Sequence, residues 1–222
     1  IISVEYPVLN DASRIKCLVP PGQGSVVKVQ VERAGVLRSI PSERRSISYA
    51  RPEIFRVTPD QLETRGEVVT LRGRNFGVDL LQLRLFIDGI GTIQAAFVSN
   101  SSDLIRFFVP CGSGQNSRSL ILYAGDQRSC QRSATDPTCV EHEVRYQPPV
   151  FKEIIPPPEG SLSSAGGFDV QIRGLNFVSQ ECFGRQTNES VEDVLITVGS
   201  SACRVINSSW ATLWCTVEEG VG

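Results

Sequence analysis

The chain repeats itself at a spacing of nearly one hundred residues. The segment YARPEIF at residues 49–55 returns in altered form as YQPPVF at residues 146–151, which lies 97 residues later. Each copy is followed by a proline, a turn, an alternating apolar stretch and a related phrase, RGRNF at 72–76 and RGLNF at 173–177. A self-similarity of this length indicates an array of similar domains. Arrays of this kind usually build an extended structure or present a surface.

Apolar and polar residues alternate with a period of two, which is typical of strands that bury one face. The clearest stretches are Val27, Val29 and Val31; Leu81, Leu83, Leu85 and Ile87; and Phe168, Val170 and Ile172. Short stretches separated by Gly, Pro, Asn and Ser turns favour an all-β sandwich. No segment has the periodicity of an amphipathic helix. We therefore predict an all-β fold.

The repeats can be phased into one complete unit and two partial ones. The complete unit is expected at 51–147, and we expect its strands near residues 53–58, 67–74, 81–88, 93–99, 103–110, 118–124 and 140–146. Residues 1–50 correspond to the second half of a unit, because IKCLVPPGQG at 15–24 aligns with IRFFVPCGSG at 105–114. Residues 148–222 correspond to the first part of a further unit.

A partial sandwich leaves a sheet face and strand edges uncovered. We expect either that the polypeptide continues beyond both ends or that another copy of the chain donates the missing strands. Simple head-to-tail donation fits less well, because the two partial units would overlap by about 24 residues. The joints at 49–52 and 146–149 are short and contain proline, which stiffens the backbone. The expected shape is a semi-rigid rod.

Composition and charge exclude several classes of function. The chain has 22 basic and 24 acidic residues, so it lacks the positive field of a nucleic-acid-binding protein. No apolar run is long enough to span a bilayer. We expect only one basic patch. It lies in an expected hairpin loop, and we interpret it as a solvated tip or, alternatively, as a contact for an acidic glycan or neighbour. It consists of Arg33, Arg38, Arg44 and Arg45.

Seven cysteines favour an oxidising compartment, and the glycosylation motifs agree with them. Asn100, Asn188 and Asn207 each begin an Asn-X-Ser sequence. Asn100 and Asn207 fall at nearly the same point of successive repeats, in an expected turn before an apolar strand. We expect an N-linked glycan on at least one of the three. The alternative is that Asn and Ser are simply common turn residues. With no signal peptide and no methionine, the chain is interpreted as a piece of a longer, processed protein.

Several phrases together resemble the IPT/TIG module, the immunoglobulin-like domain of plexins, hepatocyte-growth-factor-type receptors, fibrocystin-like proteins and some transcription factors. They are GRNFG at 73–77 with GLNF at 174–177, the pair Ala202-Cys203 followed by LWC at 213–215, a Val-Pro-x-Gly-x-Gly turn and a closing aromatic strand. The last repeat departs from the turn phrase at 217–220. The resemblance covers essentially the whole chain and implies tandem immunoglobulin-like β-sandwiches that serve as scaffolds or binding modules. Its DNA-binding members carry basic loops that this chain lacks, so no nucleic-acid binding is expected.

Two cysteine pairs lie close together in the sequence. Cys203 and Cys215 fall on strands that are expected to be neighbours in one sheet, and the family resemblance also pairs cysteines at these places. We therefore expect a disulfide between them. Cys130 and Cys139 bracket a polar hairpin tip, which a second disulfide would hold closed. Each bond would contribute about 3 kcal/mol through loop closure.

The three remaining cysteines are less constrained. In a seven-stranded sandwich, Cys111 lies at the exit pole of the complete unit and Cys182 at the entry pole of the next. These poles face each other across the Pro148-Pro149 joint, so a disulfide between the units is geometrically allowed, although the sequence does not require it. Cys17 aligns with inward-facing positions, where it is either a buried free thiol or bonded to a partner outside the segment.

An enzyme is not expected. His142 is the only histidine, and it lies between Glu141 and Glu143 on an expected strand, where a solvated side chain is the simplest interpretation. No catalytic triad, nucleophile motif or Cys/His metal spacing can be assembled. We predict no catalytic residues, no metal site and no cofactor.

Two functions remain. The first is a non-catalytic structural or adhesive segment of a long extracellular surface or fibre-forming glycoprotein. Its partners would be other protein chains, including copies of itself joined through the incomplete terminal units. The alternative is a ligand-binding ectodomain segment of a plexin-like or fibrocystin-like receptor. Such a segment needs exposed aromatic side chains on one face. The candidates are Trp210, Trp214, Phe86 and Phe108, for each of which core or interface packing is the other interpretation.

Overall fold

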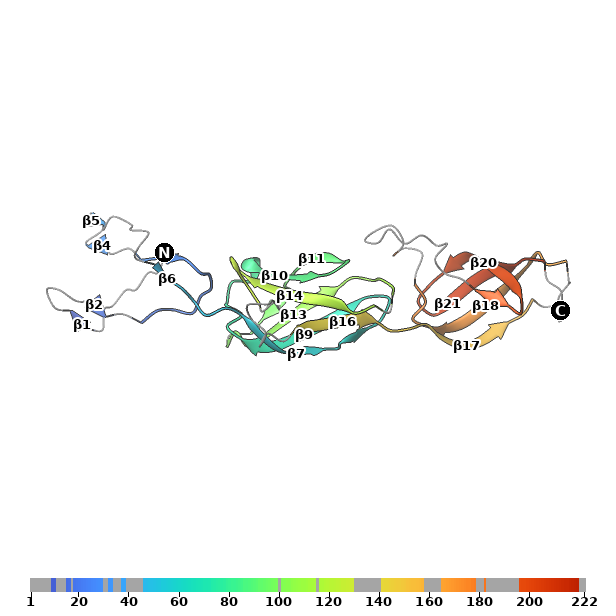
Figure 1. The fold of residues 1–222 in the computed structure, drawn as a ribbon, viewed down its shortest axis with the longest axis horizontal. Helices are drawn as coiled ribbons and strands as arrows, with labels where there is room; N and C mark the ends of the chain where they lie inside the picture. The colour runs from blue at the N-terminus through green and yellow to red at the C-terminus, as the bar shows by residue number, and fades with distance from the viewer. Residues whose placement is uncertain are drawn as a thin grey trace.

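The computed structural model forms three parts in a row: N-terminal strand pairs, a middle unit from β7 to β16 and a C-terminal unit from β17 to β21 (Figure 1). It describes residues 9–10, 15–16, 18–29, 32–33, 37–38, 46–99, 101–114, 116–129, 141–157, 165–178, 182 and 196–219. No α-helix occurs among these residues, so the predicted all-β class is confirmed. The same residues include no helix with the length and apolar character needed to cross a membrane.

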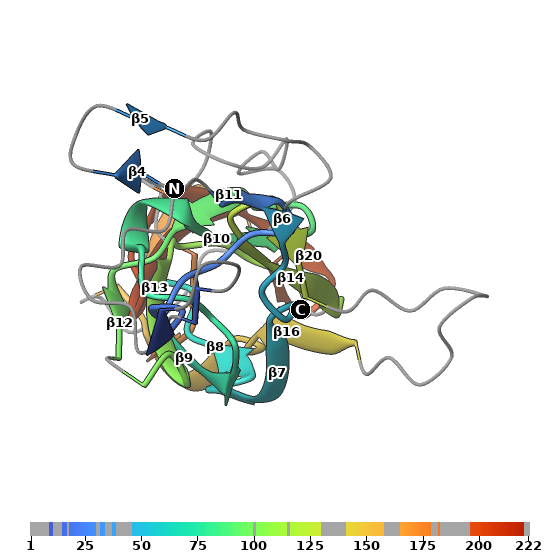
Figure 2. The ribbon, with the colours of Figure 1, turned by 90° about the vertical axis from the view of Figure 1, so that its left-hand side faces the viewer.

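The middle unit contains two facing sheets. The first has the order β12 (Phe97–Val98), β13 (Leu104–Val109), β9 (Glu67–Arg74) and β7 (Glu53–Thr58). The second has the order β11 (Gly91–Gln94), β10 (Leu83–Ile87), β14 (Arg118–Ala124), β16 (His142–Tyr146) and β8 (Gln61–Leu62), with β15 (Gln127–Arg128) paired to β14. Figure 2 looks along the row and shows β10 and β14 on the opposite side of the unit from β9 and β12.

The chain changes sheets at Pro59. Before this residue β7 pairs with β9 in the first sheet, and after it β8 pairs in parallel with β16 in the second. Proline has no N–H to donate to a strand ladder, so it ends the pairing of β7. One segment thereby borders both sheets and helps to close the sandwich.

The period-two pattern builds the core between the sheets. On β9 the inward residues Val69 and Leu71 are fully buried, and so are Ile105, Phe107 and Val109 on β13. The facing sheet contributes Leu83, Leu85, Ile87, Leu120, Leu122, Ala124, Val144 and Tyr146. Burial of one such apolar side chain stabilises the fold by about 1.5–3 kcal/mol.

Two of the residues expected to point inward are exposed, and Val29 is one of them at 37%. Leu81 shares the alternation of Leu83, but its side chain is 83% exposed, because it lies in the short 3-10 helix η1 (Leu80–Gln82) rather than in a strand. The carboxylate of Asp79 accepts a hydrogen bond from the backbone N–H of Leu81 (3.0 Å) and caps this helix.

The described part of the C-terminal unit is one antiparallel sheet. Its order is β17 (Val150–Ile155), β18 (Phe168–Leu175), β21 (Thr212–Val217), β20 (Ser201–Ser208) and β19 (Thr197–Val198). A second apolar cluster covers one face of this sheet, formed by Val170, Ile172, Phe177, Cys203, Leu213, Cys215 and Val217. Here β17 and β18 take the places that β7 and β9 hold in the middle unit.

The repeated phrases RGRNF and RGLNF fold in the same way. A Cβ atom on Gly73 would lie 1.9 Å from the carbonyl oxygen of Glu53, and one on Gly174 would lie 2.1 Å from that of Val150. Each glycine therefore allows the first strand of its unit to approach closely. Two residues later an asparagine has positive φ (60° and 58°), which is a conformation that asparagine tolerates well.

The described residues of the N-terminal part form three short strand pairs. They are β1 (Leu9–Asn10) with β2 (Ile15–Lys16), β3 (Val27–Lys28) with β6 (Ser46–Ile47), and β4 (Glu32–Arg33) with β5 (Leu37–Arg38). The sequence of this part aligns with that of the middle unit, and one hydrogen bond occurs at equivalent positions in both. The Tyr49 hydroxyl donates to the Pro20 carbonyl (2.7 Å), as the Tyr146 hydroxyl does to the Pro110 carbonyl (2.8 Å).

Candidate functional site: the joints between the units

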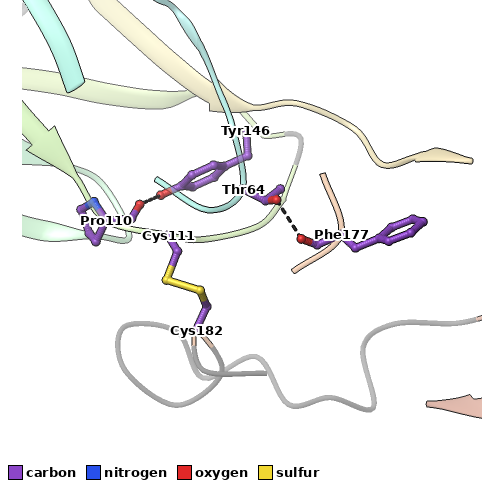
Figure 3. The surroundings of a disulfide bond; sticks show 6 residues. All are labelled: Thr64, Pro110, Cys111, Tyr146, Phe177 and Cys182. Carbon is purple, nitrogen blue, oxygen red and sulfur yellow. Dashed lines mark hydrogen bonds between the residues drawn. A yellow bond between two sulfur atoms is a disulfide. The ribbon is translucent and has the colours of Figure 1, made fainter. Parts of the chain in front are cut away.

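The second joint joins the middle and C-terminal units through Cys111 and Cys182. Cys111 follows β13 at one pole of the middle unit, and Cys182 lies in the segment after β18. The structure links them by a disulfide with a Cα–Cα distance of 5.9 Å (Figure 3). Residues 147–149 are the only backbone connection between β16 and β17, so the disulfide supplies a second covalent path across the joint.

Polar contacts support this joint close to the disulfide. The hydroxyl of Thr64, which is 3% exposed, donates to the Phe177 carbonyl oxygen (2.9 Å; Figure 3). The side-chain amide of Asn176 donates to the Gln147 side-chain oxygen (3.0 Å). A buried hydrogen bond between two units is costly to break, because its groups would lose their partners in a site shielded from water. The joint therefore favours one orientation.

A contact between an exposed arginine and a partly buried tryptophan lies on the same joint. The guanidinium of Arg65 stands 4.3 Å from the centre of the Trp210 ring, which is the geometry of a cation–π interaction. Arg65 also forms an ion pair with Glu63 (2.5 Å). Trp210, considered above as a ligand contact, is thus occupied at the interface between units.

The first joint uses an amide side chain instead of a disulfide. The side-chain oxygen of Gln23 accepts hydrogen bonds from the backbone N–H groups of Val78 (3.1 Å) and Asp79 (3.2 Å). In the aligned turns, Gln23 corresponds to Ser113 and Pro21 corresponds to Cys111. The same turn therefore contacts the following unit at both joints, through hydrogen bonds at one joint and a disulfide at the other.

A second group of contacts fixes the first joint to the β14–β15 turn. The backbone N–H of Ser25 donates to the Asp126 carboxylate (2.8 Å), and the Ser25 hydroxyl donates to the other oxygen of that carboxylate. The Gln127 side-chain amide donates to the Tyr49 carbonyl oxygen (2.7 Å). The hydrogen bond from the Ser25 hydroxyl, followed by that from its N–H, lowers the pKa of the Asp126 carboxyl below its ordinary value of 3.8.

The other cysteines and the glycosylation motifs are placed only in part. Cys203 and Cys215 form a disulfide within the C-terminal sheet, with a Cα–Cα distance of 5.4 Å. Asn207 is exposed, but it lies inside β20 opposite Trp214 rather than in the expected turn, because β20 stays paired with β21 through Ser208. The remaining predicted residues lie outside the described part of the chain: Cys17, Cys130, Cys139, Asn100 and Asn188.

Two predictions about charged or polar residues are wrong. His142 is half-buried rather than solvated, since its Nε2 lies 2.8 Å from the Ile54 carbonyl oxygen across the seam between β16 and β7. The cluster around Arg33 is not the only basic one, because the outer face of the first sheet brings together Arg56, Arg72 and Arg106. They come from three strands, so no short stretch of sequence reveals them.

Two facing sheets, antiparallel except for the β8–β16 pair, with an edge segment that serves both define the middle unit as an immunoglobulin-like β-sandwich. The C-terminal unit repeats the first four-stranded arrangement of this sandwich. Residues 149–222 match the model of the IPT/TIG domain family. Among curated proteins, none matches the sequence.

Solved structures with a similar arrangement include two of the full extracellular region of plexin A4. The one with domains 1 to 8 has 16% sequence identity and a TM-score of 0.35, and the match covers 78% of this chain and 16% of that one. The one with domains 1 to 10 has 14% identity and a TM-score of 0.32, over 79% and 13% of the two chains. A Bacteroides ovatus surface protein, SGBP-B of a mixed-linkage glucan utilization locus in complex with a heptasaccharide, has 14% identity and a TM-score of 0.30, over 76% and 37%. The chain thus spans about one sixth of the first of these proteins.

Proposed function

We propose that this chain is a non-catalytic, load-bearing or adhesive segment of an extracellular rod made of immunoglobulin-like units. The single observation that carries the proposal is that both joints are clamped by side chains of the two units they connect. Gln23 and Ser25 contribute the clamp at the first joint, and Cys111 with Cys182 the clamp at the second. A flexible linker would leave neighbouring units free to tumble, whereas these contacts restrict both joints.

The proposed units are 1–50, 51–147 and 148–222. The extracellular location is supported by two disulfides, which persist in oxidising compartments. It is also supported by the exposure of Asn207, on which we propose an N-linked glycan. The partners of the rod would be other protein chains, including further copies of this one.

Electron microscopy of the secreted chain tests the proposal. Bend angles at the two joints are measured in individual particles, first under non-reducing conditions and then after reduction. We expect a narrow distribution at both joints, and a broader one at the second joint alone after reduction. A broad distribution at both joints before reduction would contradict a load-bearing rod.

A receptor ectodomain is the second candidate, and exposed aromatic side chains favour it. Phe108 is 54% exposed and Trp214 39% exposed, each on the outer face of its sheet. Outward aromatic residues are common energetic centres of protein interfaces. Particle images also separate the two candidates: contacts that repeat between identical chains favour the rod, and isolated monomers favour the receptor.

A further inference from the structure

The outer face of the first sheet of the middle unit carries an arginine cluster that has no counterpart in the C-terminal unit. Arg56 on β7 is directly opposite Arg72 on β9, and Arg106 on β13 is opposite Thr70 on the same strand as Arg72. All three side chains are exposed, since their neighbours Leu71, Ile105 and Phe107 point into the core. We call Arg56, Arg72 and Arg106 the arginine face.

Two like charges directly opposite one another destabilise a pair of strands. The C-terminal sheet shows the arrangement that avoids this penalty. There the positions equivalent to Arg56 and Arg72 are Glu153 and Arg173, which form an ion pair at 3.1 Å. The fold therefore accepts a glutamate at the position of Arg56, and the repulsive pair in the middle unit is not imposed by the architecture.

Carboxylates around the arginine face balance its charge only in part. Among the described residues, none forms a hydrogen bond or ion pair with Arg56, Arg72 or Arg106. The carboxylates on this face are Glu53, which pairs with Arg74 at 2.8 Å, and Asp103, which accepts hydrogen bonds from two serines and lies near Arg72. Asp60, Glu141 and Glu143 line a hollow together with Arg56 at the edge of the sheet, and neither Arg72 nor Arg106 lines this hollow. At the centre of the face, Arg72 has the carboxylate of Asp103 near it, which balances one of the two positive charges of Arg72 and Arg106.

Aromatic rings border this charge. Phe97 is opposite Arg106, whose guanidinium lies 5.4 Å from its ring centre, and Phe108 is opposite Val68. Phe97, Phe108 and Val68 are 45%, 54% and 51% exposed. The face thus combines planar cationic groups with flat apolar surfaces.

We propose that the arginine face binds a sulfated polysaccharide. A guanidinium presents paired donors in a rigid fork that matches the oxygens of a tetrahedral or planar anion. A sulfated polysaccharide carries such anions along its outside and can place the apolar faces of its sugar rings against the phenylalanines. An acidic peptide fits less well, because β9 and β13 are both paired on their two sides and leave it no backbone groups to pair with on this face.

This proposal rests on the extracellular location proposed above, but its test does not depend on the stiffness of the joints. Binding of heparin to the whole chain is measured by calorimetry at low salt and at physiological salt. The triple variant Arg56→Gln/Arg72→Gln/Arg106→Gln is compared with a charge-matched control, Arg84→Gln/Arg145→Gln/Arg204→Gln, whose exposed arginines lie elsewhere. We expect at least about tenfold weaker binding for the first variant, the summed effect of three exposed charge pairs, and less than about twofold for the control.

A single variant separates a binding role from a structural one. Arg56→Glu recreates the pair seen between Glu153 and Arg173, so we expect a urea midpoint equal to or higher than that of the wild type, together with weaker heparin binding. Fully desulfated heparin should bind at least about tenfold more weakly than heparin, if sulfate groups carry the recognition.

Three results would overturn the proposal. The first is equal loss of binding in the triple variant and its control. The second is equal binding of heparin and its desulfated form. The third is displacement of heparin by poly-L-glutamate at equal charge concentration, which would assign the face to an acidic peptide.

Discussion

The covalent link across the second joint makes the strongest quantitative prediction. Cys111 and Cys182 are 71 residues apart in the sequence. While the middle unit stays folded, however, Cys111 is fixed relative to residue 147, so the free chain in an unfolded C-terminal unit spans about 35 residues. The chain-entropy relation gives about 3.8 kcal/mol for closing that loop and about 4.4 kcal/mol for the longer one. The two values are close because this entropy grows only with the logarithm of loop length.

Tryptophan fluorescence can follow the C-terminal unit alone, because both tryptophans of the chain, Trp210 and Trp214, belong to it. We expect the double variant Cys111→Ser/Cys182→Ser to lose about 3–4 kcal/mol of unfolding free energy in urea. With a urea dependence of about 1–3 kcal/mol per molar, the midpoint falls by at least about 1 M. Gln23→Ala, which alters the first joint, should leave this fluorescence transition unchanged.

A small effect would refute this reasoning. If the double variant loses less than about 1 kcal/mol while its urea dependence is unchanged, the disulfide does not restrict the unfolded chain as the loop argument requires. Alkylation of Cys111 in the unreduced wild-type chain would show directly that the bond is absent.

Three further predictions concern single features. Replacing Cys203 and Cys215 by serine should lower the unfolding free energy of the C-terminal unit by about 3 kcal/mol, because the disulfide closes a loop that spans 12 residues. Equal urea midpoints with and without the disulfide would contradict this stabilisation. The pKa of Asp126 is lower in the folded chain than its ordinary value, so its contribution to the first joint is complete above about pH 3.8 and is lost as the pH falls through the folded pKa. Carboxyl-carbon NMR should show that the Asp126 titration midpoint is higher in Ser25→Ala than in the wild type. An unchanged midpoint would contradict the Ser25–Asp126 contact. Gly174→Ala should destabilise the C-terminal unit by more than about 2 kcal/mol, because the added methyl group would meet the Val150 carbonyl oxygen and the Phe177 ring. Thermal unfolding measures this loss. A melting temperature within about 1 °C of that of the wild type would show that the strands can separate at no cost.

Much of the fold could be predicted because its signals are local. The alternation in β9 and β13 places Val69, Leu71 and Phe107 in the core, and this follows from strand geometry alone. The point at which the alternation stops predicting burial also has a physical cause. Leu81 continues the period, yet it is exposed, because the capped turn at Asp79 competes with the strand before pairing begins.

The candidate site could be predicted from the sequence only in part. The repeat spacing and the poles of a sandwich bring Cys111 and Cys182 to the same joint, although the sequence leaves their pairing open. The contacts of Gln23 and Thr64 gave no signal, because an isolated polar residue looks like any other turn residue until its partner in the next unit is known. Arg56, Arg72 and Arg106 were missed for the same reason: strand register, rather than sequence proximity, makes them neighbours.

The sequence by itself determined that strands form, where most of them lie and that similar units follow one another along the chain. Hydrophobic period, glycine and proline act within a few residues of where they stand, so they can be recognised without coordinates. The tertiary structure alone decided which side chains meet across a joint or across a sheet. Those contacts depend on strand register and on the packing of segments that are distant in the sequence. Register and packing therefore determine both the contacts at the joints and the charge of the outer face.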